Sequence, residues 1–536
     1  TTRRVVLGIA VPALLAYGVV YARHVMLRCE PAAWYDVATV LEDLRDDSTS
    51  LSRKPDDQCI GIAERASRFV GSDEAMGDDD QEIAELSRLI AAENDRVLEE
   101  HRANGRAYIT VVVATMLSSA EEGPQRDLSA GVNELRGAYL AQREWNRFGT
   151  SLLKPEVQVR LVLANVGGNS EYAVEVARQI RRYAAADPTV VAVSGMGQTR
   201  SSTIKAIEDL GGVSLPGVAV PMVGSAISGN DLAGKPYFLR VAPSNARQAM
   251  VGVEFVRTSS LLRGRRMFLL YDTSDLYSSD LAASYQAALQ GDDRDVVEMT
   301  YEAGSAGAAR TLQQRVDEIC RRSRRPLVLY AGRSNEMPTL LDLLDRSPCG
   351  RDAYVLGGDD LSQLETADFA ERATQPGWKD YVNGRLYFTT FAPTRQGWAA
   401  RSGGAERVPA VVRRFFDYYA SQRKAADGSF AFRSGPNGHI VLAYDAIKLI
   451  MDSVDRVSRS GADLTRSNVF RALRATGGGD AFEGAGGVVD FGAPDRTVPR
   501  AGAEPRCKLV IVQRVVLRSD RLVPEYQPQS EVPCRP

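Results

Sequence analysis

The sequence predicts an α/β protein with two doubly wound parallel sheets, preceded by a transmembrane helix and a small, mainly helical extension. The chain has 536 residues, of which 44% are hydrophobic, enough for about two to four domains with buried cores. Strand-like apolar segments alternate with amphipathic helical segments from residue 107 to residue 358, a pattern typical of a parallel sheet with helices on its faces. A long uncharged segment stands at the start of the chain.

The uncharged segment covers residues 5–22, VVLGIAVPALLAYGVVYA. As a helix it would extend about 27 Å, close to the roughly 30 Å hydrocarbon core of a bilayer. Val20-Tyr21-Ala22 is a poor signal-peptidase site, so we expect an uncleaved anchor over residues 1–25. The preceding arginines should face the cytoplasm, which makes the protein a single-pass membrane protein with the bulk of its chain extracytoplasmic. Because the sequence starts without Met, it leaves open whether residues precede Thr1.

Residues 26–104 are polar and acidic, and 77–101 has apolar residues at helical spacing. We expect this segment to form an extracytoplasmic cap or stalk with one disulfide. The chain has six cysteines, an even number that suggests disulfides outside the cytoplasm. Pairing of nearest neighbours is favoured among the 15 arrangements that six cysteines allow, and six free thiols are the alternative. The candidate pairs are Cys29 with Cys59, Cys320 with Cys349, and Cys507 with Cys534.

Two series of strands and helices follow, of similar size and without an obvious sequence repeat. The first has expected strands at 107–117, 157–167, 189–195 and 218–225, with helices at 135–148, 172–185 and 203–210. The second has strands at 265–272, 296–302, 326–332 and 353–358, with helices at 278–290, 309–323 and 336–346. The remainder is too short for a third α/β domain; we expect a strand at 385–393, helices at 407–421 and 440–457, and a strand at 508–517.

Several stretches in order resemble the type I periplasmic binding proteins of the branched-chain amino-acid-binding type. They are GVNELRGAYLAQREWN, VVAVSGMGQTRSST, VPMVGSAISGNDLAGKPYFLRVAPS, YDTSDLYSSDL and AYDAIKL. The resemblance covers residues 105–520 and leaves the amino-terminal extension outside. It implies two lobes joined by three crossovers, with the ligand in the cleft between them and hinge-like closure. The implied lobes are 105–245 with 394–505, and 246–393 with 506–536.

The stretch VSGMGQTRSST (193–203) is expected to form part of the first lobe's binding site. Ligands of open α/β sheets bind beyond the carboxyl ends of the strands. A nucleotide site is disfavoured, because Arg200 replaces the third glycine of a dinucleotide fingerprint and no phosphate-loop lysine follows. The resemblance aligns Thr199, next to Gln198, with a hydroxyl that holds the ligand carboxylate; alternatively, Thr199 only caps its own helix. We expect Arg200 to point away along the helix surface.

The resemblance implies four further contacts. Ala226 supplies a carbonyl and Ser228 a hydroxyl, unless they belong to an ordinary polar loop. Tyr277 closes over the ligand or is an aromatic packed at a helix start. Asp359 pairs with a ligand ammonium, or is an N-cap or solvated loop acid, the role expected for Asp360.

Arg333 departs from the family pattern, in which many members carry an aromatic residue. It could neutralise Asp359 or grip an acidic ligand with two hydrogen bonds. The expected ligand is therefore amino-acid-like or another small polar molecule.

The predicted function is an extracytoplasmic binding protein that closes on its ligand and feeds an ABC transporter. The alternative is a membrane-anchored sensor coupled to a cytoplasmic signalling partner. A net charge of −2 without a basic stripe argues against a nucleic-acid partner. We expect no enzymatic activity, cofactor or metal, because the chain has no GxSxG, Walker A or CxxC motif, and both His101 and His439 are expected to be structural.

Overall fold

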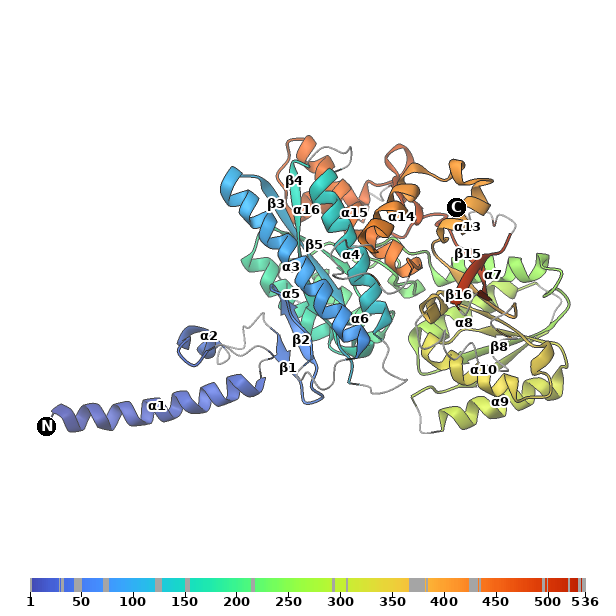
Figure 1. The fold of residues 1–536 in the computed structure, drawn as a ribbon, viewed down its shortest axis with the longest axis horizontal. Helices are drawn as coiled ribbons and strands as arrows, with labels where there is room; N and C mark the ends of the chain where they lie inside the picture. The colour runs from blue at the N-terminus through green and yellow to red at the C-terminus, as the bar shows by residue number, and fades with distance from the viewer. Residues whose placement is uncertain are drawn as a thin grey trace.

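The computed structural model describes most of the chain. The described residues are 2–27, 29, 33–42, 51–70, 77–120, 128–149, 155–213, 217–291, 295–304, 307–365, 381, 384–423, 432, 435–493, 497–498, 500–518, 521–528 and 532. Two seven-stranded sheets form its framework. Each is covered by helices, and we call each sheet with its helices a lobe (Figure 1).

The first lobe is built on a sheet with the order β1-β2-β4-β3-β5-β6-β7. Its strands are β1 (Ser52–Arg53), β2 (Cys59–Ala63), β3 (Ala107–Thr115), β4 (Val157–Asn165), β5 (Val190–Gly195), β6 (Met222–Gly224) and β7 (Phe238–Arg240). From β4 to β7 neighbouring strands are parallel, whereas β1 and β2 are antiparallel additions at one edge.

Helices cover both faces of this sheet because successive strand side chains point to opposite sides. Val111 and Val113 pack with α3 (Asp78–Asn104), α4 (Ser129–Phe148), α15 (Gly438–Arg459) and α16 (Arg466–Arg474). Val112 and Ala114 pack with the opposite layer, formed by α5 (Ala173–Ala186) and α6 (Ser201–Leu210).

The second lobe is built on a sheet with the order β16-β15-β12-β11-β10-β8-β9. Its strands are β8 (Arg266–Asp272), β9 (Val296–Tyr301), β10 (Pro326–Tyr330), β11 (Tyr354–Gly357), β12 (Leu386–Thr390), β15 (Ile511–Arg518) and β16 (Arg521–Tyr526). The run from β9 to β12 is parallel, and β15 and β16 extend it antiparallel. One face carries α7 (Asn245–Thr258) and α8 (Leu276–Leu289); the other carries α9 (Ala308–Arg322) and α10 (Met337–Asp345).

The chain passes between the lobes three times, as the family resemblance implies. It crosses from β7 to α7, returns after β12 to α13 (Arg395–Ser402), and crosses again before β15. Between the second and third crossings lie α14 (Ala410–Arg423), α15, α16 and the hairpin of β13 (Phe482–Gly484) with β14 (Gly487–Val489). α15 packs mainly against α4 of the first lobe. Short 3₁₀ helices complete the chain: η3 (Gly168–Ser170), η4 (Asn230–Leu232), η5 (Ser334–Glu336), η6 (Gly350–Asp352), η7 (Asp359–Glu365), η8 (Ala405–Arg407) and η9 (Gly478–Asp480).

The amino-terminal residues form α1 (Thr2–Leu27), which extends away from both lobes, and the short α2 (Val37–Glu42) (Figure 1). Within the part of the chain that the structure describes, no helix is both long and apolar enough to cross a membrane. The side chains of residues 1–13, which include half of the uncharged segment 5–22 within the predicted anchor over 1–25, lie outside the described residues.

Within the predicted cap or stalk of residues 26–104, the described residues 52–70 and 77–104 differ from that expectation, because they belong to the layers of the first lobe. All five residues of β2 are buried, and the strand pairs with β4. On α3, Ile83, Leu86 and Ile90 belong to the core of that lobe. The apolar spacing thus predicted the helix correctly, but it does not reveal the surface that buries the helix, which α4 and β4 provide.

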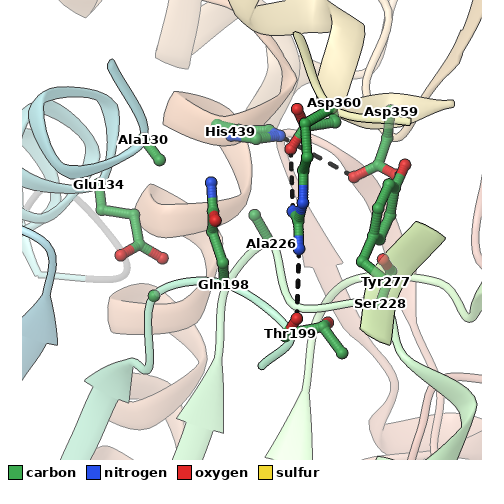
Figure 2. A pocket seen from close by; sticks show the side chains of 12 residues that line it. Ala130, Glu134, Gln198, Thr199, Ala226, Ser228, Tyr277, Asp359, Asp360 and His439 are labelled. Carbon is green, nitrogen blue, oxygen red and sulfur yellow. Dashed lines mark hydrogen bonds and ion pairs between the residues drawn. The ribbon is translucent and has the colours of Figure 1, made fainter. Parts of the chain in front are cut away.

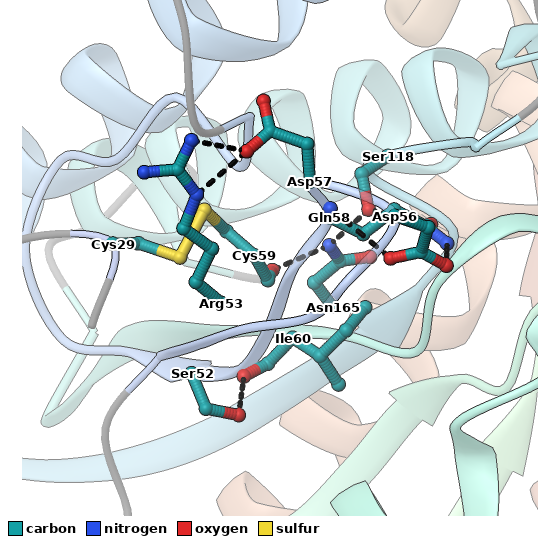
Figure 3. Close-up of a disulfide and its surroundings, with 10 residues drawn as sticks. All are labelled: Cys29, Ser52, Arg53, Asp56, Asp57, Gln58, Cys59, Ile60, Ser118 and Asn165. Atoms are coloured by element: carbon teal, nitrogen blue, oxygen red, sulfur yellow. Dashed lines mark hydrogen bonds and ion pairs between the residues drawn. A yellow bond between two sulfur atoms is a disulfide. The ribbon is translucent and has the colours of Figure 1, made fainter. Parts of the chain in front are cut away.

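Two of the favoured disulfides are present, Cys29–Cys59 and Cys320–Cys349. Cys507 is also disulfide-bonded, and Cys534 lies outside the described residues. Figure 3 shows that the first disulfide attaches the segment after α1 to β2, where the Asn165 side chain of β4 donates to the Cys59 carbonyl at 2.7 Å. The end of α1 is therefore linked covalently to the edge of the first sheet.

Candidate functional site

A small buried cavity lies where the carboxyl ends of the parallel strands of the two lobes face each other (Figure 2). Its volume is about 20 Å³, which is the scale of a single water molecule. All seven predicted site residues line it, although they follow five different strands or loops. The lining residues are Ala130, Glu134, Gly197, Gln198, Thr199, Ala226, Ser228, Tyr277, Arg333, Asp359, Asp360 and His439.

The turn after β5 explains the two glycines of VSGMGQTRSST. Gly195, Met196 and Gly197 have φ values of 96°, 73° and 67°, in the left-handed region that glycine adopts most readily. A Cβ on Gly195 would lie 2.7 Å from the Ala114 carbonyl oxygen, and one on Gly197 would lie 2.7 Å from Ser170 Oγ. The glycines therefore serve a sharp turn packed against its neighbours, which brings Gln198 and Thr199 to the cavity wall.

Thr199 connects two loops of the first lobe instead of capping its own helix. Its hydroxyl accepts a hydrogen bond from the Gly229 N–H at 3.2 Å. The N-cap residue of α6 is Arg200, and its side chain makes no capping hydrogen bond. The loop after β6 is itself buried around Ser228, whose carbonyl accepts from the Asn245 N–H at 2.9 Å. Thr199, Ala226 and Ser228 thus line the same cavity, and their contact with a ligand stays a prediction.

Arg200 does not point away along the helix surface, as expected from the sequence. It donates to Asp275 Oδ2 of the second lobe at 2.5 Å, and to Asn169 Oδ1 at 2.9 Å. The reason is tertiary: the N-terminus of α6 faces the N-terminus of α8, where Asp275 is a buried N-cap. Arg200 therefore forms an ion pair between the lobes at the edge of the cavity.

On the second lobe, Tyr277 and Asp359 contact each other directly. The Tyr277 hydroxyl donates to Asp359 Oδ1 at 2.8 Å, and the Asp359 N–H donates to Gln248 Oε1 at 2.6 Å. Burial, reinforced by the charge of Asp360, raises the pKa of Asp359 to about 7, although hydrogen bonds and Arg333 partly oppose it. Tyr277 is therefore part of the cavity wall, and its hydroxyl orients the Asp359 carboxyl.

His439 lies in the same wall, with Nε2 at 3.9 Å from Asp359 Oδ2. Burial lowers the pKa of His439 to about 4, so the imidazole is neutral near pH 7. It therefore places no positive charge beside Asp359. Only a structural role was expected for His439 from the sequence, which did not place it at the cavity. His439 lines the cavity because α15 begins at Gly438 and its first turn faces the cavity.

Arg333 occupies the space between the two lobes. Its guanidinium forms ion pairs with Asp275 at 3.2 Å and with Asp360 at 3.1 Å, and it donates to the Thr199 carbonyl of the other lobe at 3.2 Å. It also lies over the Tyr277 ring, 4.4 Å from the centroid. Burial lowers the pKa of Arg333, but the two carboxylates outweigh that effect and hold it above its usual value.

This arrangement corrects the expectation for Asp360, which is neither solvated nor an exposed loop acid. Asp360 is 4% exposed; it accepts from the Ser334 N–H at 2.7 Å as well as from Arg333. Two roles were considered for Arg333, and the contacts do not support the first, which was to neutralise Asp359. The guanidinium pairs with Asp275 and Asp360 and leaves Asp359 with no cationic partner among the described residues.

Glu134 is the functional candidate that sequence reasoning missed most clearly. It lies on α4, one turn after Ala130, and the Ser225 hydroxyl donates to its Oε1. Burial raises the pKa of Glu134 to about 7, and Ser225, Thr115 and the Gly197 backbone partly oppose this shift. The available signal was positional: α4 is the first helix after β3, so its first turns lie at the carboxyl edge where ligands bind.

No family model and no curated protein matches this chain. Solved structures do match, and three illustrate them. A leucine-binding protein from Thermotoga maritima has 18% identity and a TM-score of 0.55, with 78% of this chain and 97% of that chain covered. A fatty acid ABC transporter substrate-binding protein from Thermomonospora curvata has 14% identity, a TM-score of 0.55, and coverage of 79% and 93%.

The third is a solute-binding protein of an ABC transporter from Rhodopseudomonas palustris, solved with 3,4-dihydroxybenzoic acid. It has 13% identity and a TM-score of 0.55, with 79% of this chain and 97% of that chain covered. At such identities the likeness establishes a shared fold. The ligands named for the three proteins differ in charge and size, so the fold does not specify what this cavity binds.

Proposed function

Given that the chain has the fold of the type I periplasmic binding proteins, we propose that it binds a small amino-acid-like ligand between its lobes and delivers it to an ABC transporter. The observation that carries the proposal is the cavity itself. Residues of both lobes line it, and among the described residues the Asp359 carboxyl there has no cationic partner. A buried carboxyl without a cation is unfavourable, and a ligand ammonium would compensate it. The proposal is for a binding protein and assigns no catalytic step or cofactor.

The ligand carboxylate would lie against the first lobe. Thr199, Ser228 and Gln198 line the cavity there and carry two hydroxyls and an amide, close to the start of the ten-residue α6. A helix N-terminus favours an anion because its free N–H groups and its dipole point toward it. The ligand ammonium would then lie between Asp359 and the Ala226 carbonyl.

Ligand entry would require the lobes to separate, because the cavity of about 20 Å³ is far smaller than an amino acid. The contacts that would break join the lobes directly: Arg200 to Asp275 at 2.5 Å, Arg333 to the Thr199 carbonyl at 3.2 Å, and Ser129 to Gln363 at 2.7 Å. Three crossovers at one side provide the hinge. We propose that these polar contacts re-form around the ligand on closure.

An extracytoplasmic location is part of this proposal, because the disulfides Cys29–Cys59 and Cys320–Cys349 form and persist in oxidising compartments. The predicted anchor would attach the protein to the membrane, and the first disulfide would link that anchor to the edge of the first lobe. Protease accessibility of the intact cells, compared with disrupted cells, tests this location.

Asp359→Asn is expected to weaken ligand binding by about 10- to 100-fold, the loss of one charge-assisted hydrogen bond. Calorimetric titration with a panel of the common amino acids measures it. The exposed Asp231 provides the control, since Asp231→Asn should bind as the wild type does. A ligand that binds the wild type tightly and Asp359→Asn equally well would remove Asp359 from the site. If no amino acid binds the wild type, the proposed ligand class is wrong.

Affinity for an ammonium-bearing ligand is expected to rise about tenfold between pH 6 and pH 8. The pKa of Asp359 is raised to about 7 by burial, so at pH 6 most free protein carries the neutral acid, which must release its proton to solvent before the carboxylate can pair with the ligand ammonium. Because the pKa of Asp359 is raised in the folded protein, protonated Asp359 contributes to the free energy of unfolding at low pH. This contribution is lost as pH rises through about 7. His439, with a pKa of about 4, stays neutral throughout. Titrations at three pH values measure the slope; affinity that falls with rising pH contradicts the assignment.

A further inference from the structure

Glu134 is a second buried carboxyl on the cavity wall, and it comes from the other lobe. Figure 2 shows Glu134 and Ala130 on one side of the cavity, with Asp359 and Tyr277 on the opposite side. Glu134 is 2% exposed, and its Oε2 is buried without a hydrogen bond of normal geometry to the described residues. Oε1 accepts a hydrogen bond from the neutral Ser225 hydroxyl.

The charged groups around the cavity divide into a compensated set and an uncompensated pair. Arg333 and Arg200 balance Asp275 and Asp360 through ion pairs of 2.5–3.2 Å. Glu134 forms no ion pair with any described residue, and Asp359 approaches only His439, a neutral imidazole whose pKa is lowered by burial. Once both acids ionise, the cavity therefore carries two negative charges that the described chain does not balance.

We propose that the ligand carries two cationic groups, as a diamino acid does, one directed to Asp359 and the other to Glu134. This inference rests on the proposed binding function and narrows its ligand class. A neutral amino acid would leave one buried carboxyl uncompensated, at a cost in desolvation or in a retained proton. Because the two carboxyls belong to different lobes, such a ligand would connect them and stabilise the closed arrangement.

The opposing interpretation is that Glu134 stays protonated and only joins the Ser225 loop to α4. The two interpretations differ in what Glu134→Gln does. Glutamine keeps the size and the hydrogen-bonding capacity of the neutral acid, so a purely structural group tolerates the change. A group that binds a cation does not, because the amide carries no charge.

The experiment is calorimetric titration of the full chain with lysine, ornithine and 2,4-diaminobutyrate, against norleucine as the neutral analogue of lysine. We expect at least one diamino acid to bind at least tenfold more tightly than norleucine. In Glu134→Gln this preference should fall to threefold or less, with norleucine affinity unchanged. Glu144→Gln is the matched control: Glu144 is a buried acid on the same helix, but it lies 3.6 Å from Lys448 and does not line the cavity. It should retain the wild-type preference.

Proton release provides a second readout that a structural role would not produce. Repeating the titration in two buffers of different ionisation enthalpy near pH 7 should show release of about one proton by the wild type and about half a proton by Glu134→Gln. A wild type that prefers norleucine, or a Glu134→Gln protein that keeps the diamino preference, overturns the inference. If the wild type prefers norleucine and that binding still depends on Asp359, the proposed binding function stands and only the diamino ligand class is wrong. If no ligand binds, both the proposed function and the ligand class are overturned.

Discussion

Arg333→Met is expected to lower the free energy of unfolding by about 3–5 kcal/mol, the loss typical of removing one partner from a buried ion pair. Arg333 is 6% exposed and pairs with two acids that are each 4% exposed, Asp275 and Asp360. Methionine fills much of the volume of the arginine side chain. It leaves the buried Asp360 carboxylate with hydrogen-bond donors but without its cationic partner. Asp275 retains Arg200, so the larger part of the loss should come from Asp360.

Chemical denaturation without added ligand measures this change in unfolding free energy. Two further variants serve as a control and as a rescue. Arg395→Met removes an arginine from an ion pair with Asp417, at 2.6 Å, in which both side chains are more than half exposed; it should cost about 1 kcal/mol or less. Adding Asp360→Asn to Arg333→Met should recover part of the stability, because it removes the unpaired charge. A loss in Arg333→Met no larger than that in Arg395→Met contradicts a compensated buried network.

Replacing Cys320 and Cys349 together by alanine is expected to cost about 3–4 kcal/mol of unfolding free energy. The disulfide closes a loop of sequence separation 29, and the chain-entropy model assigns roughly this value to a loop of about 30 residues. The loop contains β10, Arg333 and α10, so the disulfide restrains the segment that places Arg333 in the cavity.

The double variant should therefore lose ligand affinity as well as stability, since Arg333 is less well positioned in it. Denaturation and titration of the same preparation separate the two effects. Equal unfolding free energies for wild type and double variant, within about 1 kcal/mol, would show that the disulfide adds little beyond the packing of Cys349, which is 3% exposed.

The convergence of the seven predicted site residues could be anticipated because each follows the carboxyl end of a parallel strand or its loop. Gln198 and Thr199 follow β5, Ala226 and Ser228 follow β6, and Asp359 follows β11. Strand order and parallel register bring such ends to one edge, so residues distant in sequence become neighbours. Their position at the cavity is observed, and their contact with a ligand stays a prediction.

The ion pairs within the site could not be anticipated in the same way. Arg200 was expected to point along the helix surface and Asp360 to be an N-cap or a solvated loop acid. Arg200 instead contacts the opposite lobe, and Asp360 forms an ion pair with Arg333. Whether an acid or a base at a loop is solvated depends on what the other lobe brings against it, and local spacing contains no information about that surface.

Alternating apolar segments and the order of motifs predicted the α/β fold class and its two sheets, because helix and strand periodicity and parallel-strand connections are properties of local sequence. Nearest-neighbour pairing of the cysteines predicted two of the disulfides. Only the tertiary structure decided the electrostatics of the cavity. It paired Arg333 with Asp275 and Asp360, left Asp359 and Glu134 without a cationic partner among the described residues, and placed β2 and α3 in the first lobe. The physical reason is that burial and charge compensation depend on side chains brought together from strands and helices far apart in the chain.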